Sequence, residues 1–185
     1  MATKSGAKKS APPGDLEAIY RAIDRVQAVS EFKLDGTVIT ANQNFLDLFG
    51  YTLGEVQGQH HRIFCESSYA SSPEYAEFWA KLAKGELEQA EFKRFAKDGR
   101  EIWLRASYNP VFDNNGNVVR VIKFATDVTK EKLQTADYEG KIRAIDRVQA
   151  VIEFKLDGTV ITANQIFLDN FGYTLGEVQG QHHRI

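Results

Sequence analysis

Hydrophobic residues recur at helical spacing near the start of the chain. Residues 1–14 are polar and rich in Lys, Ala, Ser and Pro, and we expect them to form a disordered leader. From 15 to 29, apolar side chains recur every three or four positions, which predicts an amphipathic helix. Its apolar residues are Leu16, Ile19, Ile23 and Val26.

The pattern then alternates, which predicts two paired strands. Residues 31–34 alternate between polar and apolar side chains, Asp35-Gly36 is a hairpin turn signal, and residues 37–40 continue as the returning strand. Short helices follow. Asn42 can cap the first of them, and Gly50 stops it.

A longer helix and three strands complete this region. Ser72-Pro73 opens the helix, which carries a stripe of apolar residues including Trp79. Beyond it the period returns to two over residues 86–96, 101–112 and 118–126. The order of elements predicts an α+β domain, in which a five-stranded antiparallel sheet carries short helices on one face.

An internal repeat divides the chain. Residues 22–63 and 144–185 differ at only three positions, which are Ser30/Ile152, Asn44/Ile166 and Leu48/Asn170. We therefore expect a complete domain over 30–129, a linker helix over 130–151 and a truncated second copy over 152–185. The parent protein is expected to carry an output domain beyond residue 185.

Composition narrows the classes of function. The chain is 43% hydrophobic and 26% charged, with a formal net charge of −2, so no basic surface for nucleic acid is expected. No apolar run approaches membrane-spanning length, and we expect a cytoplasmic protein without a membrane segment. The single cysteine, Cys65, excludes an intrachain disulfide.

The histidines argue against catalysis. All four occur as the adjacent pairs His60-His61 and His182-His183, so no other imidazole is available for a catalytic triad. Adjacent histidines seldom converge on one metal without further ligands, and no metal site is expected. We predict that the chain is not an enzyme.

Three stretches of sequence resemble a known family. They are TVITANQNFLDLFGYTLGEVQGQ, EYAEFWAKLAKGE and KRFAKDGREIWLRASYNPVFDNNGNVVRVIKFATDVT. The chain resembles a PAS domain, most closely those of bacterial chemoreceptors of the aerotaxis-receptor type. The resemblance implies a sensory module for redox state or oxygen. Asp127 and Thr129 match the short motif that ends many PAS domains and relays the signal to the next helix.

The resemblance leaves the cofactor open. FAD is the first candidate, because Asn42 and Trp79 match residues of the aerotaxis-receptor pattern, with Asn44 and Arg62 nearby in sequence. Haem b is the alternative, with His60 or His61 as the axial ligand. A cofactor-free module for dimerisation or protein docking is the third. A flavin photoadduct of the light-sensing subgroup is not expected, because His61 occupies the place of its cysteine.

Finally, the truncated copy predicts self-association. It lacks counterparts of residues 86–126, which leaves an apolar face and a strand edge exposed. We expect a dimer through the helices, with a domain swap of the half repeat as one route.

Overall fold

The computed structural model describes residues 13–184, which fall into two compact units that divide after Thr129. The expected leader lies outside the described residues apart from Pro13 and Gly14, which open helix α1 (Pro13–Asp24).

Helix α1 is shorter than the sequence predicted. It ends at Asp24 rather than at residue 29, and strand β1 (Ala28–Phe32) begins four residues later. The side chain of Asn42 stabilises this early end, because its amide donates to the backbone carbonyls of Asp24 and Gln27. Residues 28 and 29 are then free to pair with strand β5, where Val29 becomes buried.

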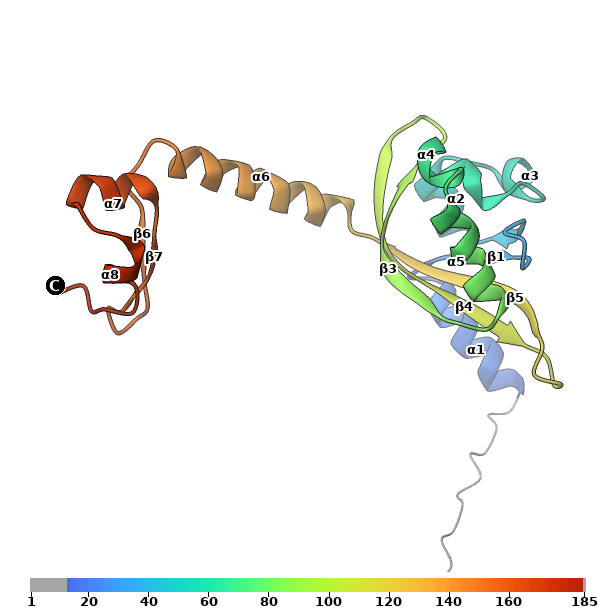
Figure 1. The fold of residues 1–185 in the computed structure, drawn as a ribbon. Coiled ribbons are helices and arrows are strands. Elements are labelled where there is room, and N and C mark those ends of the chain that lie inside the picture. The colour runs from blue at the N-terminus through green and yellow to red at the C-terminus, as the bar shows by residue number, and fades with distance from the viewer. Residues whose placement is uncertain (1–12, 185) are drawn as a thin grey trace, which may run out of the picture. The chain divides into compact units, whose positions relative to one another are not determined.

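Five strands form one antiparallel sheet in the order β2-β1-β5-β4-β3 (Figure 1). The remaining strands are β2 (Val38–Ala41), β3 (Glu88–Phe95), β4 (Glu101–Phe112) and β5 (Val118–Asp127). The predicted α+β class and five-stranded sheet are thereby confirmed.

The short helices cover one face of this sheet (Figure 1). They are α2 (Gln43–Phe49), α3 (Leu53–Val56), the 3₁₀ helix η1 (His61–Phe64), α4 (Ser67–Ala70) and α5 (Pro73–Ala83). Side-chain caps begin α2 and α5, among others. Asn42 accepts from the Phe45 amide, as its predicted capping role requires, and Ser72 accepts from the Tyr75 amide.

Aromatic rings fill the space between helices and sheet. The fully buried rings are Phe32, Phe45, Phe49, His61, Phe64 and Tyr108, with Tyr75, Phe78 and Trp79 nearly so. Because these rings come from both layers, burying them fixes the short helices on the sheet.

The second unit begins with helix α6 (Thr129–Asp146), whose first residue closes the first unit, and then repeats the start of the first unit. It contains β6 (Ile152–Phe154), β7 (Val160–Ala163), α7 (Gln165–Phe171) and α8 (Leu175–Val178). The linker helix was predicted to reach residue 151 but ends at Asp146. The cause is the same as in the first copy, since the Asn164 amide donates to the carbonyls of Asp146 and Gln149.

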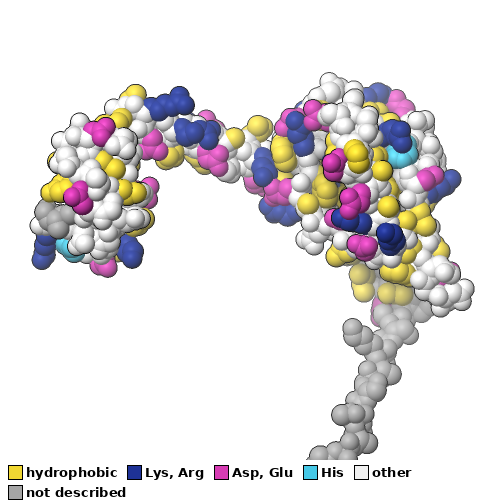
Figure 2. Space-filling model, viewed as in Figure 1, with side chains coloured by type: hydrophobic (Ala, Val, Ile, Leu, Met, Phe, Trp, Pro, Cys, Tyr) yellow, Lys and Arg dark blue, Asp and Glu magenta, His cyan; other side chains and the backbone are white. Residues whose placement is uncertain are grey.

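The apolar face of the second copy is open. Phe154 is 43% exposed and Phe171 61%, whereas their counterparts Phe32 and Phe49 are 0% exposed. A cavity on this face is lined by Ile152, Phe154, Val160, Phe167, Phe171, Tyr173, Val178 and His183. Figure 2 shows hydrophobic side chains at the surface of this unit. Nearly identical sequences thus have unequal surroundings, because within the described residues only the first unit contains α5 and strands β3 to β5.

We predict that Gly36→Ala destabilises the first unit more than Gly99→Ala. Both glycines have positive φ, at 87° and 83°, so both substitutions strain the backbone. A Cβ at Gly36 would also lie 2.8 Å from the buried Trp79 ring, whereas one at Gly99 would meet nothing within 4 Å. Urea unfolding of the two variants measures the difference, and equal losses of stability would contradict the packing of Trp79 on this turn.

Candidate functional site

His61 lies at the centre of the aromatic interior. Its backbone N–H donates to the carbonyl of Gly36 over 2.8 Å, which holds the start of η1 against the β1–β2 turn. His60 precedes it as the N-cap, and the His60 ring accepts from the Arg62 amide. His60 therefore stays half-buried at the surface, while the His61 side chain is 0% exposed.

Both ring nitrogens of His61 are hydrogen-bonded. Nδ1 lies 2.9 Å from the Tyr75 hydroxyl on α5, and Nε2 lies 2.9 Å from the Tyr108 hydroxyl on β4. One nitrogen donates and the other accepts, because the buried imidazole is neutral. Burial lowers the pKa of His61 well below its ordinary value, and the charges of Arg94 and Lys123 lower it further.

Aromatic rings surround this bridge. The His61 ring centroid lies 5.4 Å from that of Phe32, 5.5 Å from Trp79 and 5.7 Å from Tyr108, all edge to face. Such spacing is direct contact between rings. The indole N–H of Trp79 is buried in this shell without a hydrogen-bond partner.

Two buried basic side chains complete the interior, and neither was predicted from the sequence. Arg94 on β3 is 3% exposed and Lys123 on β5 is 1% exposed. Arg94 donates to the Lys93 carbonyl over 2.7 Å and approaches the Tyr108 hydroxyl at 3.4 Å. Lys123 Nζ lies 5.0 Å from the centroid of the Tyr108 ring. The available signal for Lys123 was strand parity, since residues two apart on a strand share a face and both Val121 and Ala125 are apolar.

Cys65 is next to His61 but is not activated by it. Its Sγ lies 3.6 Å from His61 Nδ1. Burial raises the pKa of the Cys65 thiol, although the nearby cations Arg94 and Lys123 oppose this. A neutral thiol beside a neutral imidazole is a poor nucleophile.

The residues expected for FAD do not come together. The side chain of Asn42 lies at the joint where α1, β1 and α2 meet. Its Oδ1 accepts hydrogen bonds from the backbone amides of Val29 and Phe45 there. Asn44 donates to the same two carbonyls as Asn42 does and is exposed. The amide of Asn44, which Ile166 replaces in the second copy, therefore faces this joint rather than the aromatic interior. Arg62 is exposed, and only Trp79 joins the histidines.

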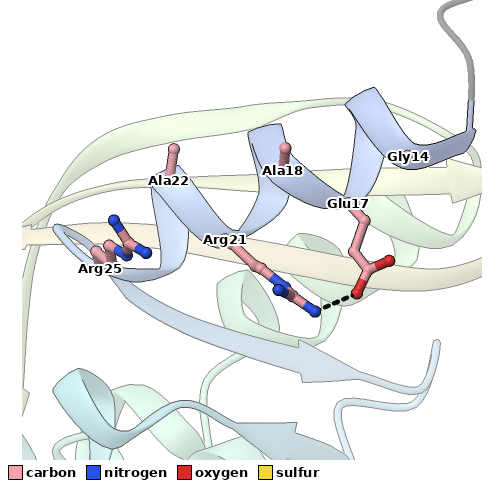
Figure 3. Close-up of a pocket in the computed structure, with 6 residues that line it drawn as sticks. All are labelled: Gly14, Glu17, Ala18, Arg21, Ala22 and Arg25. Atoms are coloured by element: carbon pink, nitrogen blue, oxygen red, sulfur yellow. Dashed lines mark hydrogen bonds and ion pairs between the residues drawn. The ribbon is translucent and has the colours of Figure 1, made fainter.

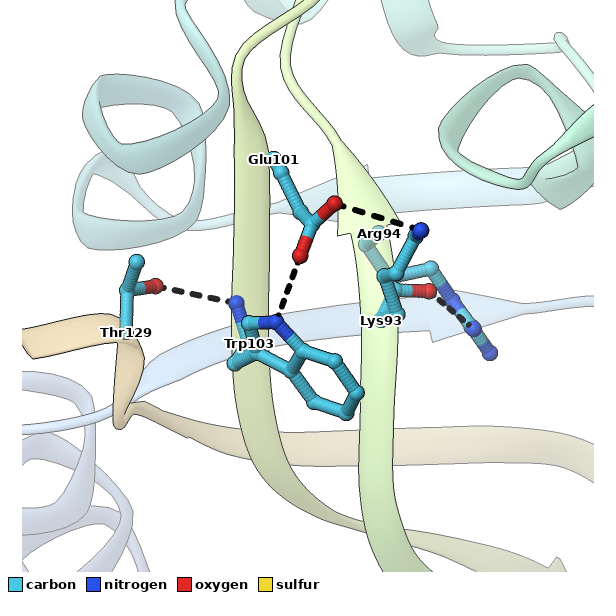
Figure 4. A network of polar contacts seen from close by, with 5 residues as sticks. All are labelled: Lys93, Arg94, Glu101, Trp103 and Thr129. Carbon is cyan, nitrogen blue, oxygen red and sulfur yellow. Dashed lines mark hydrogen bonds and ion pairs between the residues drawn. The ribbon is translucent and has the colours of Figure 1, made fainter. Parts of the chain in front are cut away.

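Asp127 and Thr129 form a latch at the end of the sheet. The Thr129 hydroxyl and amide donate to the Asp127 carboxylate, and the hydroxyl oxygen accepts from the Trp103 amide over 2.9 Å. The Trp103 indole donates to Glu101, which also pairs with Lys93 (Figure 4). We call Trp103, Asp127 and Thr129 the exit latch, because they join β4 and β5 to the first residue of α6.

A shallow cavity of about 320 Å³ lies apart from this interior, along one side of α1 (Figure 3). It is lined by Gly14, Glu17, Ala18, Arg21, Ala22 and Arg25. Arg21 pairs with Glu17 there, and both side chains are more than half exposed. Its polar groups are thus already paired or hydrated, and the cavity offers no enclosed ligand site.

Comparison with known proteins agrees with this architecture. Residues 38–125 match the family described as PAS fold, and residues 149–184 match the family described as PAS domain. The biofilm dispersion protein BdlA of Pseudomonas aeruginosa is 42% identical over 163 residues, which cover 88% of this chain and 39% of that protein. The aerotaxis receptor of Escherichia coli is 28% identical over 114 residues, covering 62% and 22% respectively.

Solved structures share the fold. The PAS domain of a protein from Colwellia psychrerythraea superposes with a TM-score of 0.55 at 23% identity, covering 63% of this chain and 98% of that one. An RNA-binding light-oxygen-voltage receptor gives 0.59 at 24% identity, covering 77% and 41%. This chain belongs to the PAS family and carries a sensory domain of the kind found in signalling proteins. It spans less than half the length of the curated relatives above. Among the described residues, no helix is long and apolar enough to cross a membrane.

We predict that the first unit loses stability as the pH falls below about 6.5. The unfolded chain then protonates His61 while the folded chain does not, because burial depresses the folded pKa. The slope contributed by one such proton approaches about 1.4 kcal/mol per pH unit. Urea unfolding between pH 7.5 and 4.5 measures it.

His61→Gln removes the titrating imidazole and should flatten the dependence of the unfolding free energy on pH. His60→Gln, the control, should retain most of that dependence. Parallel stability profiles for the wild type and His61→Gln would contradict the burial of a neutral imidazole.

Proposed function

We propose that the first unit is a cytoplasmic sensory module whose interior around His61 responds to a bound cofactor and whose exit latch relays that response to α6. The observation that carries the proposal is the hydrogen-bonded bridge from Tyr75 through His61 to Tyr108. It joins η1 and α5 to β4, and the same strand carries Trp103 of the exit latch. A change at His61 therefore has a continuous route to the start of α6.

Haem b is the cofactor that this interior supports best. A neutral imidazole in an apolar aromatic shell is a suitable iron ligand, and a second hydrogen bond at Nδ1 is typical of metal-binding histidines. Tyr75 offers that bond, and Nε2 would have to leave the Tyr108 hydroxyl. Haem bound there would supply an iron that takes a diatomic gas or changes oxidation state.

FAD, the first expectation from the resemblance, has weaker support. Its two matching residues serve different parts of the domain, since Asn42 holds the α1–β1 joint and Trp79 packs beside His61. A role in oxygen or redox sensing rests partly on the likeness to an aerotaxis receptor. A chemoreceptor or other output domain in the parent protein is proposed on the same grounds.

Reconstitution of the purified chain with hemin, and separately with FAD, tests this function. We expect a Soret band that is lost in His61→Ala and retained in His60→Ala, the matched control in the adjacent position. Hydrogen exchange should also change on binding at the Trp103 amide, which reports the exit latch.

Identical hemin spectra for the wild type and the His60→Ala/His61→Ala double variant would remove haem. Flavin bands that weaken in Trp79→Phe and Asn42→Ala would restore FAD. Cofactor binding without any change at the Trp103 amide would contradict the relay.

The open face of the second copy supports self-association. We predict that the 185-residue chain forms dimers or larger oligomers, whereas a version ending near Thr135 stays monomeric and keeps any cofactor. The exposed rings of Phe154 and Phe171 provide the driving force. Light scattering measures both versions.

Phe171→Asp in the second copy should reduce association without affecting the first unit. A domain swap, in which the second copy displaces residues 28–63 of another chain, would appear as chains that stay associated after dilution. A monodisperse monomer of the 185-residue chain would contradict the proposal.

A further inference from the structure

The same joint between a helix and a hairpin occurs in both units. In the first unit α1 meets β1 and α2, and in the second α6 meets β6 and α7. The sequences that build the two joints are almost identical. The backbone turn after each helix is also the same. The Gln27 amide donates to the carbonyl of Ile23, and the Gln149 amide makes the equivalent bond. The two joints can therefore be compared bond by bond.

The strand side of the joint is alike in the two units. In the first unit, Oδ1 of Asn42 accepts from the amide of Val29 over 2.9 Å. In the second unit, Oδ1 of Asn164 accepts from the amide of Val151 over the same distance of 2.9 Å. The backbone amide of each asparagine also donates to the carbonyl of that valine. The strand and the helix that follows the hairpin are thus held together equally in both units.

Two side-chain amides hold the helix side of the joint in the first unit. The Asn42 side chain donates to the carbonyls of Asp24 and Gln27 over 3.1 and 2.9 Å. The Asn44 side chain donates to the same two carbonyls over 2.9 and 3.1 Å. Asn42 also donates to the Asp24 carboxylate over 2.9 Å. The end of α1 is therefore tied to the start of α2 by both asparagines.

The helix side of the joint in the second unit keeps one of these two amides. Asn164 donates to the carbonyls of Asp146 and Gln149. Ile166 stands where the first copy has Asn44, and an isoleucine side chain has no donor. In the described part of this unit, the buried apolar cluster and the residues packed on it do not include Ile166, so packing does not replace the lost bonds. Fewer hydrogen bonds therefore attach α6 to its hairpin than attach α1.

We propose that the joint after α6 is a hinge, and that Ile166 makes it one. Each hydrogen bond of this kind changes the equilibrium between a closed and an open joint by roughly fivefold. The end of α6 therefore opens locally more often than the end of α1 does. Because α6 begins at the exit latch, a movement of α6 turns at this joint without unfolding the hairpin. The inference goes beyond the proposed function and rests on it only for the cause of that movement.

Hydrogen exchange of the cofactor-free 185-residue chain tests the hinge, with the amides of Gln27 and Gln149 as reporters. Both lie in the same local sequence, so the exchange rates of their unfolded segments are equal. Ile166→Asn restores the missing amide and should slow exchange at Gln149 at least about fivefold. Asn44→Ile removes that amide from the first unit and should speed exchange at Gln27 by a similar factor. The amide of Gly180, which donates to the carbonyl of Val160, reports the stability of the second unit as a whole and should not change.

Asn170→Leu is the matched control, because it also restores a residue of the first copy but lies at the far end of α7, where Asn170 is exposed. It should leave exchange at Gln149 unchanged. Unchanged exchange at Gln149 in Ile166→Asn, or at Gln27 in Asn44→Ile, would overturn the proposal. Equal slowing at Gln149 and Gly180 would overturn it too, since that result is a general gain in stability. These amides report the hinge without a Soret band or a change at the Trp103 amide, so the hinge and the proposed function can fail independently.

Discussion

The first unit depends on the two hydrogen bonds that the His61 ring makes to the hydroxyls of Tyr75 and Tyr108. Four-residue helices such as η1 are too short to be stable alone, so they need tertiary contacts to hold their place. The imidazole supplies such contacts in two directions, toward α5 and toward β4. Because it is neutral and fully buried, it joins the helical layer to the sheet without placing another charge in the aromatic interior.

Strand β4 links this interior to the end of the domain. Tyr108 faces His61, and Trp103 on the same strand donates its amide to Thr129 at the start of α6. Arg94 approaches the same Tyr108 hydroxyl, and Lys123 Nζ lies over the Tyr108 ring. A ligand that changes the position of Tyr108 would thus act on the strand that also holds the exit latch. The equivalent histidine in the second copy is His183. The described part of that unit contains no counterpart of β4 or α5, and so no counterpart of Tyr108 or Tyr75.

Much of the fold could be predicted from the sequence, because turn signals and strand alternation are local. The Asp35-Gly36 hairpin, the Ser72-Pro73 helix start and the three later strands follow from them. The end of α1 could not be predicted, since a side chain 18 residues away, Asn42, sets it. The site was predicted only in part. Buried charges break the usual link between polarity and exposure, so strand parity alone pointed to Lys123, and nothing local singled out Arg94.

A double-mutant cycle between His61 and Tyr108 tests the central claim, that their hydrogen bond holds the helical layer on the sheet. Tyr108→Phe leaves one buried ring nitrogen of His61 without a partner and should cost about 1–3 kcal/mol of unfolding free energy. In the His61→Phe background, where that nitrogen is gone and the ring is retained, the same substitution should cost much less. Urea unfolding of the four proteins measures the coupling. An equal cost of Tyr108→Phe in both backgrounds would contradict the account.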